Sequence, residues 1–558
     1  MTATAAGARR GASLEWAAAL TAAVASVVLF CWAGRDFWFR LDVWDFLAGR
    51  EAGSFESWIR PHAGHLQWVT VGVHRLLYGA VGLDFWPWYY LIPVAGYAGL
   101  SLLLWRALLR RGTDRGVAFV AYLVVLVLGI AAFLSSIVVG GLIVMALLLW
   151  VAGRLDADAS GGVGARLLVS GALLLMVTTS SLGVAGLAAC LLAVALTGGL
   201  RRWWWTFLPG VAAYAAWYAA RGGSDPQGSV GWGHLPSLPG DALTLLGNAV
   251  GRVFGIDGGG LITGAVAAAA LATGLGWLAW KRRLRRWDLV FGGTLGGYLL
   301  MVVLVRGAAG KIPLETARYS WPIILLAVPL VVPHLRLPAR LAGRARVAVL
   351  LVAGGFLVGM NTWDRLAETN ALEREAFGGR VAIETVGELV AAGEPAIDGL
   401  RLKADLGMGM AGVLTAADVR GFLGDGWEPA PPLQFYELDR VRRQLRFFPL
   451  ERAVEGEATV PALAAAIDAP EGCVEMRPGG TRRFTVARAG GFTLEAAGRD
   501  RATRVALSWR DPFGEFAEEL VVTRVTALMA AAPPAGGAGL VVSNLGDKRL
   551  IVCGVTGI

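Results

Sequence analysis

The chain has 558 residues, of which 56% are hydrophobic and only 17% are charged, and its mean hydropathy is +0.57. This composition excludes an ordinary soluble enzyme and predicts a mainly α membrane protein with many spanning helices. The formal net charge of +9 comes largely from arginines in short loops between apolar runs. The positive-inside rule accounts for such arginines, and without a basic patch on a reading module we expect no nucleic-acid partner.

The N-terminal segment begins with Arg9 and Arg10 and continues into an apolar run from Ala17 to Trp32. This order of charges and apolar residues is typical of a signal peptide. Because no small-residue cleavage site follows, we expect an uncleaved signal-anchor helix with its N-terminus in the cytoplasm.

Apolar runs predict about eleven spans before Trp363, since about 20 apolar residues cross a bilayer. The predicted windows are 14–33, 86–108, 116–134, 136–153, 165–180, 182–199, 203–220, 260–280, 287–306, 320–334 and 346–362. The arginine-rich segments between them fall on one side, which the positive-inside rule makes the cytoplasm. The segments 34–85, 221–259 and 307–319, and the tail after Trp363, are then extracytoplasmic.

The first outer loop, 34–85, carries a dense cluster of ionisable side chains beside a predicted span. The cluster contains Arg40, Asp42, Asp45, Arg60, His62 and His65. In so apolar a chain, such a cluster at the membrane surface favours a reaction site. Further along the loop, Leu66 to Tyr78 predicts a helix lying in the membrane interface, and we expect His74 and Arg75 on its polar face.

A second polar group precedes the tenth predicted span, within 307–319. It contains Lys311, Glu315 and Arg318. Glu315 lies three residues before Arg318 and would orient its guanidinium on a helix. The alternative is that Arg318 only extends its charge from a helix end to the membrane surface.

The sequence changes character after Trp363, and residues 363–558 are predicted to form an extracytoplasmic α/β region. Residues 368–390 have a helical pattern. From about Cys473, apolar alternation between Gly, Pro and Asp turns predicts strands, and hence a small β-sandwich over 473–558. Cys473 and Cys553 lie at its two ends and are a candidate disulfide pair in an oxidising compartment.

The many predicted spans, the acidic residues of the stretch Asp42–Phe46 after the first of them, and Arg318-Tyr319 before a late span resemble the GT-C superfamily of membrane glycosyltransferases. The aspartate and aromatic stretch and the segment Pro61-His62-Ala63-Gly64-His65 are similar to those of a set of actinobacterial multispanning membrane proteins. The resemblance covers residues 14–362. It implies transfer of a sugar from a polyprenyl-phosphate donor to a glycan, lipid or protein acceptor of the cell envelope, on the outer side of the plasma membrane.

The resemblance also implies roles for individual residues. The acidic motif of the superfamily falls on Asp42, with Asp45 about one helical turn later, where both carboxylates would share a face. We expect Asp42 to be the base that takes the acceptor proton and Asp45 to orient the acceptor or to bind a divalent cation such as Mg²⁺ or Mn²⁺, although either aspartate could be the base. The donor phosphate would be bound by cationic side chains from both outer segments, namely Arg60, His62, His65, Lys311 and Arg318.

Each of these assignments has an alternative. Asp42 and Asp45 would also serve as caps of a short interfacial helix. His62 and His65 would also suit a metal pair, although a third ligand is not evident, or a purely structural role. For the whole chain, the alternatives to an enzyme are a transporter or flippase of lipid-linked saccharides and a non-catalytic envelope scaffold. A transporter more often places ionisable residues in the middle of the membrane, and few are visible in these spans.

Overall fold

The structure analysed is a computed structural model of the chain. It describes residues 2–35, 37–39, 43–47, 50, 54–62, 64–82, 87–128, 138–157, 162–222, 235–256, 259–304, 317–336, 345, 347–363, 365–366, 447–449, 474–486, 491–496, 503–511, 514–522, 525–530, 539–546, 549–553 and 555–557. The chain divides into two compact units, Met1–Ala376 and Phe377–Ile558. The predicted helix at 368–390 lies outside the described residues.

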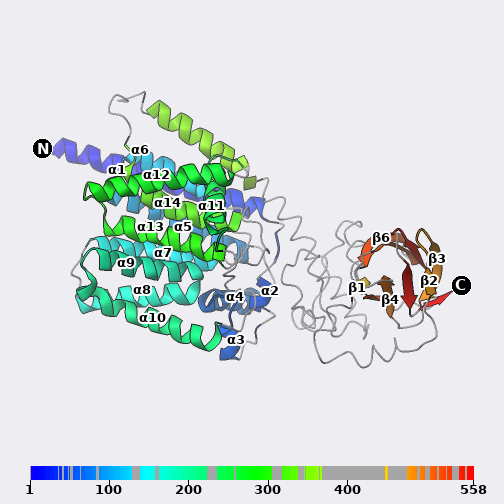
Figure 1. Ribbon diagram of the computed structural model, residues 1–558. Coiled ribbons are helices and arrows are strands. Elements are labelled where there is room, and N and C mark those ends of the chain that lie inside the picture. The colour runs from blue at the N-terminus through cyan, green and yellow to red at the C-terminus, as the bar shows by residue number, and fades with distance from the viewer. Residues whose placement is uncertain are drawn as a thin grey trace. The chain divides into compact units, whose positions relative to one another are not determined.

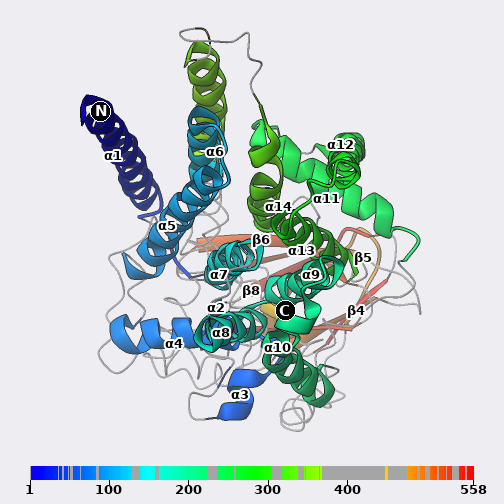
Figure 2. The ribbon, with the colours of Figure 1, turned by 90° about the vertical axis from the view of Figure 1, so that its left-hand side faces the viewer.

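The first unit is helical (Figure 1). Its helices are α1 Thr2–Ala33, α2 Val43–Leu47, α3 Phe55–Ile59, α4 Trp68–Val81, α5 Trp88–Arg110, α6 Arg115–Leu128, α7 Val138–Asp156, α8 Val163–Thr179, α9 Ser181–Leu196, α10 Leu200–Arg221, α11 Leu238–Val253, α12 Gly260–Trp280, α13 Arg286–Val302 and α14 Ala317–Val331, followed by the 3-10 helix η5 Val332–His334 and a last apolar helix Val347–Trp363. Figure 2 shows α7, α8, α9 and α10 packed beside one another.

Four helical segments in the described part of the chain are long and apolar enough to cross a membrane. They are Leu14–Ala33 in α1, α5, Val139–Asp156 in α7, and α12. Each coincides with a predicted span. Other predicted spans correspond to shorter apolar helices, among them α6, α8 and α9. The mainly helical membrane character is therefore supported, whereas the count of eleven spans stays a prediction.

The predicted outer loop 221–259 contains a helix that the apolar pattern does not reveal. Helix α11 is shorter than a span and carries Asp241, Asn248 and Arg252. Helix α11 packs antiparallel to α12. The two backbones are in direct contact because Gly247 and Gly264, which lie at this contact, have no side chains. Small residues spaced four apart let membrane helices approach this closely.

Charged side chains connect several helices at one end of the helical unit. Arg111 at the end of α5 pairs with Asp156 at the end of α7. The side chain of Asp288, fully buried at the start of α13, accepts a hydrogen bond from Nε2 of His334 at 3.1 Å. The backbone N–H of Trp287 donates to Asp156 at 3.3 Å. The ends of α5, α7, α13 and η5 are therefore held together by paired charges away from the first outer loop.

The second unit contains two five-stranded antiparallel sheets. One has the order β1-β7-β4-β9-β2 and the other β10-β3-β8-β5-β6. The strands are β1 Phe447–Pro449, β2 Val474–Met476, β3 Thr481–Val486, β4 Gly491–Ala496, β5 Thr503–Asp511, β6 Gly514–Val522, β7 Val525–Ala530, β8 Gly539–Asn544, β9 Leu550–Cys553 and β10 Val555–Gly557. Leu494 and Val552 of the first sheet and Val505 and Val542 of the second are fully buried. The predicted strands are present, and their packing as a sandwich stays a prediction.

Candidate functional site

The first outer loop is fixed to the helical unit by contacts with distant helices. The Thr70 hydroxyl of α4 donates to the carbonyl of Thr179 at the end of α8, at 3.1 Å. Gly140 of α7 packs directly against Thr70, which leaves no room for a side chain at that position. The indole N–H of Trp217 in α10 donates to the carbonyl of Ile59 at 2.7 Å. The loop is therefore held in place by α7, α8 and α10.

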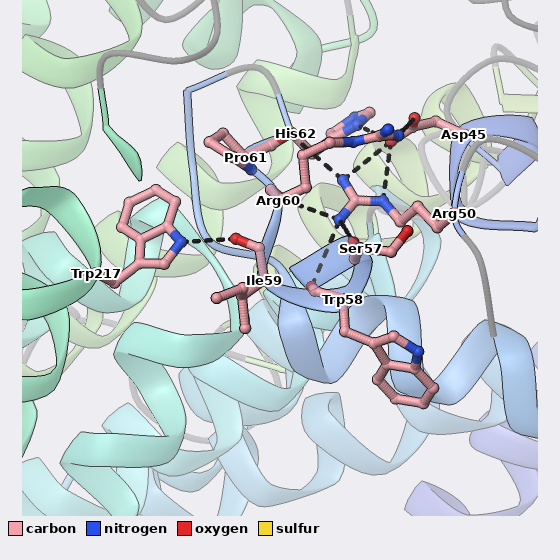
Figure 3. A network of polar contacts seen from close by, with 9 residues as sticks. All are labelled: Asp45, Arg50, Ser57, Trp58, Ile59, Arg60, Pro61, His62 and Trp217. Carbon is pink, nitrogen blue, oxygen red and sulfur yellow. Dashed lines mark hydrogen bonds and ion pairs between the residues drawn. The ribbon is translucent and has the colours of Figure 1, made fainter. Parts of the chain in front are cut away.

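Asp45 in α2 accepts hydrogen bonds from three side chains (Figure 3). Its Oδ2 accepts from Nε and Nη2 of Arg50, at 3.2 and 3.0 Å, and from Nδ1 of His62, at 2.8 Å. Its Oδ1 accepts from Nη2 of Arg60 at 3.0 Å. A carboxylate only accepts hydrogen bonds, so this contact assigns the proton of His62 to Nδ1. The aspartate thereby orients both a guanidinium and an imidazole.

Arg50 is the fully buried centre of the loop, with a side-chain exposure of 0%. Besides Asp45, it donates through Nη1 to the carbonyl oxygens of Ser57 at 3.0 Å and Arg60 at 2.8 Å. A buried guanidinium is stable only when its charge and its donors are satisfied. Arg50 therefore has a structural role that ties α2 to the segment after α3.

Arg60 and His62 differ in exposure although both contact Asp45. The Arg60 side chain is 47% exposed, and the His62 side chain only 2%. His62 is held further by its backbone, which forms paired hydrogen bonds with His65 at 2.9 and 3.1 Å. Gly64 within this tight turn has a φ of 79°, a conformation that favours glycine. The turn places His65 next to His62 and fixes the ring of His62 beside Asp45.

The environment of Asp45 makes it a weak base. Burial by itself would raise the pKa of Asp45, but the hydrogen bond from His62 and the positive charge of Arg50 outweigh burial and hold the pKa well below its usual range. A group with so low a pKa stays ionised and has little tendency to take a proton. The adjacent guanidinium groups also disfavour a divalent cation at this carboxylate. The geometry thus indicates that Asp45 positions Arg60 and His62.

The predicted interfacial helix corresponds to α4, but the prediction that His74 lies on its polar face is wrong. His74 is 3% exposed, its Nδ1 contacts the carbonyl of Thr70 at 2.8 Å, and its ring lies 5.3 Å from that of Phe46. Phe46 also packs against the His62 ring, at 4.8 Å. Burial, only partly offset by the contact with Thr70, lowers the pKa of His74 to about 4. His74 is therefore part of the packing beneath the Asp45 cluster.

Several predicted site residues lie outside the described residues. They are Asp42, Lys311, Glu315 and Cys473. The backbone of Arg318 belongs to the first turn of α14. Three residues later, Trp321 packs on Gly141 of α7, next to the Gly140 that contacts α4. The start of α14 and the first outer loop therefore pack at neighbouring positions of α7.

Two arginines near this cluster were not expected to belong to it. Arg50 pairs with Asp45 five positions earlier, but its other partners are backbone carbonyls 7 to 11 positions later, which no side-chain pattern in the sequence reveals. Arg75 of α4 is expected from the sequence on a solvated face. Its Nε and Nη2 atoms are instead shielded from solvent, and it directly follows His74, whose ring packs on Phe46 beneath the cluster.

The described part of this site is a partly buried cationic cluster at one end of a helical unit. The guanidinium groups of Arg50 and Arg60 surround the carboxylate of Asp45, and Arg75 lies on the neighbouring helix α4. Within the described residues, no three His, Cys, Asp or Glu side chains are placed to hold a metal ion. Comparison of the chain with models of known protein families and with curated proteins finds no match.

Proposed function

We propose that the protein is a membrane glycosyltransferase that moves a sugar from a polyprenyl-phosphate donor to a cell-envelope acceptor. The observation that carries this proposal is the half-exposed Arg60, fixed by Asp45 beside the buried His62. An oriented guanidinium is suited to a phosphate ester when the described side chains around it carry more positive than negative charge. The resemblance of the same segment to the GT-C superfamily agrees with this chemistry.

In this proposal the chain has eleven spans, a cytoplasmic N-terminus and an extracytoplasmic C-terminal region. The arrangement of charged ends supports it. Arg111 and Arg286 lie at helix ends that meet Asp156 and Leu155, whereas the Asp45 cluster contacts the opposite end of α8 through Thr179. Arginines concentrate on the cytoplasmic side of membrane proteins. The Asp45 cluster would then face the outside, where a lipid-linked donor is available.

The reaction is a substitution at the anomeric carbon of the donor sugar. The oxygen of an acceptor hydroxyl forms the new glycosidic bond, the bond between the sugar and the phosphate oxygen breaks, and the polyprenyl phosphate leaves with the electron pair. Asp42 is the proposed base for the hydroxyl proton. Arg60, and His62 in its protonated form, donate hydrogen bonds to the phosphate as its charge develops. Asp45 takes no proton and holds both donors in position.

An apolar groove of about 360 Å³ supports the proposal that the substrate is linked to a lipid. It lies between α9 and α10 and is lined by Val184, Leu187, Ala188, Leu191, Val211, Tyr214, Ala215 and Tyr218. Its lining suits an isoprenoid chain, which offers no polar group to satisfy. Trp217, whose ring lies 5.4 Å from that of Tyr214, holds the Ile59 carbonyl next to Arg60. The groove and the cationic cluster are thus linked through one side chain of α10.

The test is transfer by purified full-length protein from defined polyprenyl-phosphate sugars to hydroxyl acceptors. Wild type should release polyprenyl phosphate only when donor and acceptor are both present. Asp42→Asn should bind the donor and abolish transfer, because it removes the base and leaves the phosphate ligands. Undiminished transfer by Asp42→Asn would rule out this base. Donor binding without transfer by wild type, across a range of acceptors, would favour the transporter or flippase instead, and absence of both would favour the scaffold.

A further inference from the structure

Arg75 lies on α4 directly after His74, which packs beneath the cluster, and two nitrogen atoms of its guanidinium group have no hydrogen-bond partner in the described part of the chain. Its Nε and Nη2 atoms are shielded from solvent and have no hydrogen-bond acceptor among the residues that the structure describes. Arg50, by contrast, uses Nε, Nη1 and Nη2. A buried donor without a partner costs about 1–3 kcal/mol, and a charged one costs more. A cation kept in this state is suited to an anion that arrives from outside the chain.

The position of Arg75 is set by the same contacts that build the cluster. It follows His74, whose ring packs on Phe46 of α2. One turn earlier, Thr70 anchors α4 to Thr179. Asp45 accepts from Arg50, His62 and Arg60, and the Nε and Nη2 atoms of Arg75 make no hydrogen bond to it. The backbone of α4 is thus rigidly placed, while the charge of Arg75 is left without a counter-ion among the described residues.

The electrostatics favour an anion that several cations share. Partial burial, and after it the positive charge of Arg50, lower the pKa of Arg75, so the charged form of Arg75 is disfavoured at this place. With Arg60, the two arginines amount to three positive charges against the one negative charge of Asp45 among the described side chains. A phosphate group relieves this excess of positive charge and accepts parallel hydrogen bonds from a guanidinium. A neutral sugar hydroxyl would not relieve it.

We propose that Arg75 binds the phosphate group of the lipid-linked donor, together with Arg60. This assignment rests on the proposed function and adds a ligand from α4, a helix that contains none of the residues to which the GT-C resemblance gives a role. Arg75 thereby selects donors by the charge of their carrier, and it contacts the group that becomes the leaving phosphate.

The experiment measures binding separately from transfer. Purified full-length protein in nanodiscs of neutral lipid is titrated with polyprenyl phosphate, for wild type, Arg75→Gln, Arg75→Lys and the control Arg106→Gln, an exposed arginine of α5. We expect Arg75→Gln to weaken binding roughly tenfold or more, the scale of one lost charge-assisted contact. Arg75→Lys should be intermediate, because an ammonium keeps the charge without the planar fork. Arg106→Gln should bind as wild type does.

A second readout separates ligand binding from a structural role. Without polyprenyl phosphate, Arg75→Gln should melt at the same temperature as wild type or higher, because it removes an unsatisfied buried charge. A lower melting temperature together with unchanged binding would overturn the assignment. Titrations with phosphatidylglycerol and with inorganic phosphate distinguish the source of the anion. Binding of either one as tight as that of polyprenyl phosphate would overturn a donor-specific role.

The outcomes also separate this inference from the proposed function. If wild type binds polyprenyl phosphate and Arg75→Gln does not, but no donor supports transfer, the role of Arg75 stands and the transferase fails. If wild type transfers sugar and Arg75→Gln binds the donor equally well, the transferase stands and the role of Arg75 fails. If wild type binds no polyprenyl phosphate, both fail.

Discussion

Nδ1 of His62 donates a 2.8 Å hydrogen bond to Oδ2 of Asp45, and the same oxygen accepts two hydrogen bonds from Arg50. This relationship changes the interpretation of the aspartate. A carboxylate that orients an imidazole and neutralises a fully buried guanidinium acts through its neighbours. Asp45 is accordingly a positioning residue, and its removal should disturb the whole loop.

Replacing Asp45 by Asn should destabilise the protein strongly. Arg50 would keep its buried charge without a counter-ion, a situation that costs about 3–5 kcal/mol. Tryptophan fluorescence during heating in detergent measures the loss as a lower melting temperature. The control is Glu56→Gln, which removes a 2.8 Å ion pair with Arg221 between side chains 69% and 36% exposed, and should cost less than about 1 kcal/mol. Equal melting temperatures for the two variants would contradict the role given to Asp45.

The free energy of unfolding should decrease as the pH is lowered, over a pH range set by the pKa values of His74. Its pKa is about 6.5 when unfolded and about 4 when folded. Below pH 6.5 the unfolded chain therefore binds a proton that the folded chain refuses, so stability declines as pH falls from 6.5 to 4 and then levels off, by up to ~3 kcal/mol. His74→Gln should remove this part of the slope. An identical pH dependence of unfolding in wild type and variant would refute the assignment.

The stability supplied by Asp45 should be lost at still lower pH. Its folded pKa lies below the unfolded value of about 3.9, so the contribution is complete above that value and declines as pH falls toward the folded pKa. Urea unfolding of His74→Gln at pH 5 and at pH 3 isolates this second window. The double variant with Asp45→Asn should show a smaller difference between the two pH values.

The contact between α11 and α12 should tolerate no side chain at Gly264. A Cβ atom there would collide with the carbonyl of Leu243. Gly264→Leu should therefore separate the helices and cost about 1–3 kcal/mol or more. Gly274→Leu on the same helix is the matched control, because its Cβ would have no atom within 4 Å. Thermal melting of the two variants should differ by several degrees, and equal melting would show that the two helices are not in close contact.

A disulfide should join Cys473 and Cys553. Cys473 directly precedes β2 in the sequence, and Cys553 is the last residue of β9, the strand that pairs with β2 through Val474 and Val552. In an oxidising compartment, cysteines at the ends of paired strands are candidates for a disulfide. Position 473 is outside the described residues, so the test is chemical. Mass spectrometry of non-reduced peptides from membrane-extracted protein should find this link, whereas two free thiols would contradict it.

The sequence predicts the elements of this protein better than their partnerships. Most predicted spans correspond to helices, because runs of apolar residues depend only on local composition. Helix α11 is missed because Asp241, Asn248 and Arg252 interrupt its apolar pattern, and its stability comes from contact with α12. Local patterns contain no information on such tertiary packing.

For the candidate site too, the sequence predicts which residues belong to it but not which contacts they make. That Asp45, Arg60 and His62 share one loop is visible in the sequence, and the structure brings them together. Their roles are not visible there, since the low basicity of Asp45 follows from contacts with Arg50 and His62. The anchoring of α4 depends on Thr70 and Thr179, which are 109 positions apart. No spacing rule connects two such residues.

The hydrogen bonds of Arg50 have a consequence for mutational tolerance. Its Nη1 and Nη2 reach backbone carbonyls of Ser57, Trp58, Arg60 and Pro61, at distances from 2.8 to 3.5 Å. Every amino acid provides a carbonyl, so the side chains at Ser57 and Trp58 can vary without loss of these bonds. In a deep mutational scan, substitutions at Ser57 and Trp58 should therefore be tolerated better than substitutions of Arg50. These four hydrogen bonds depend on the side chain at position 50 and on the course of the backbone that it contacts.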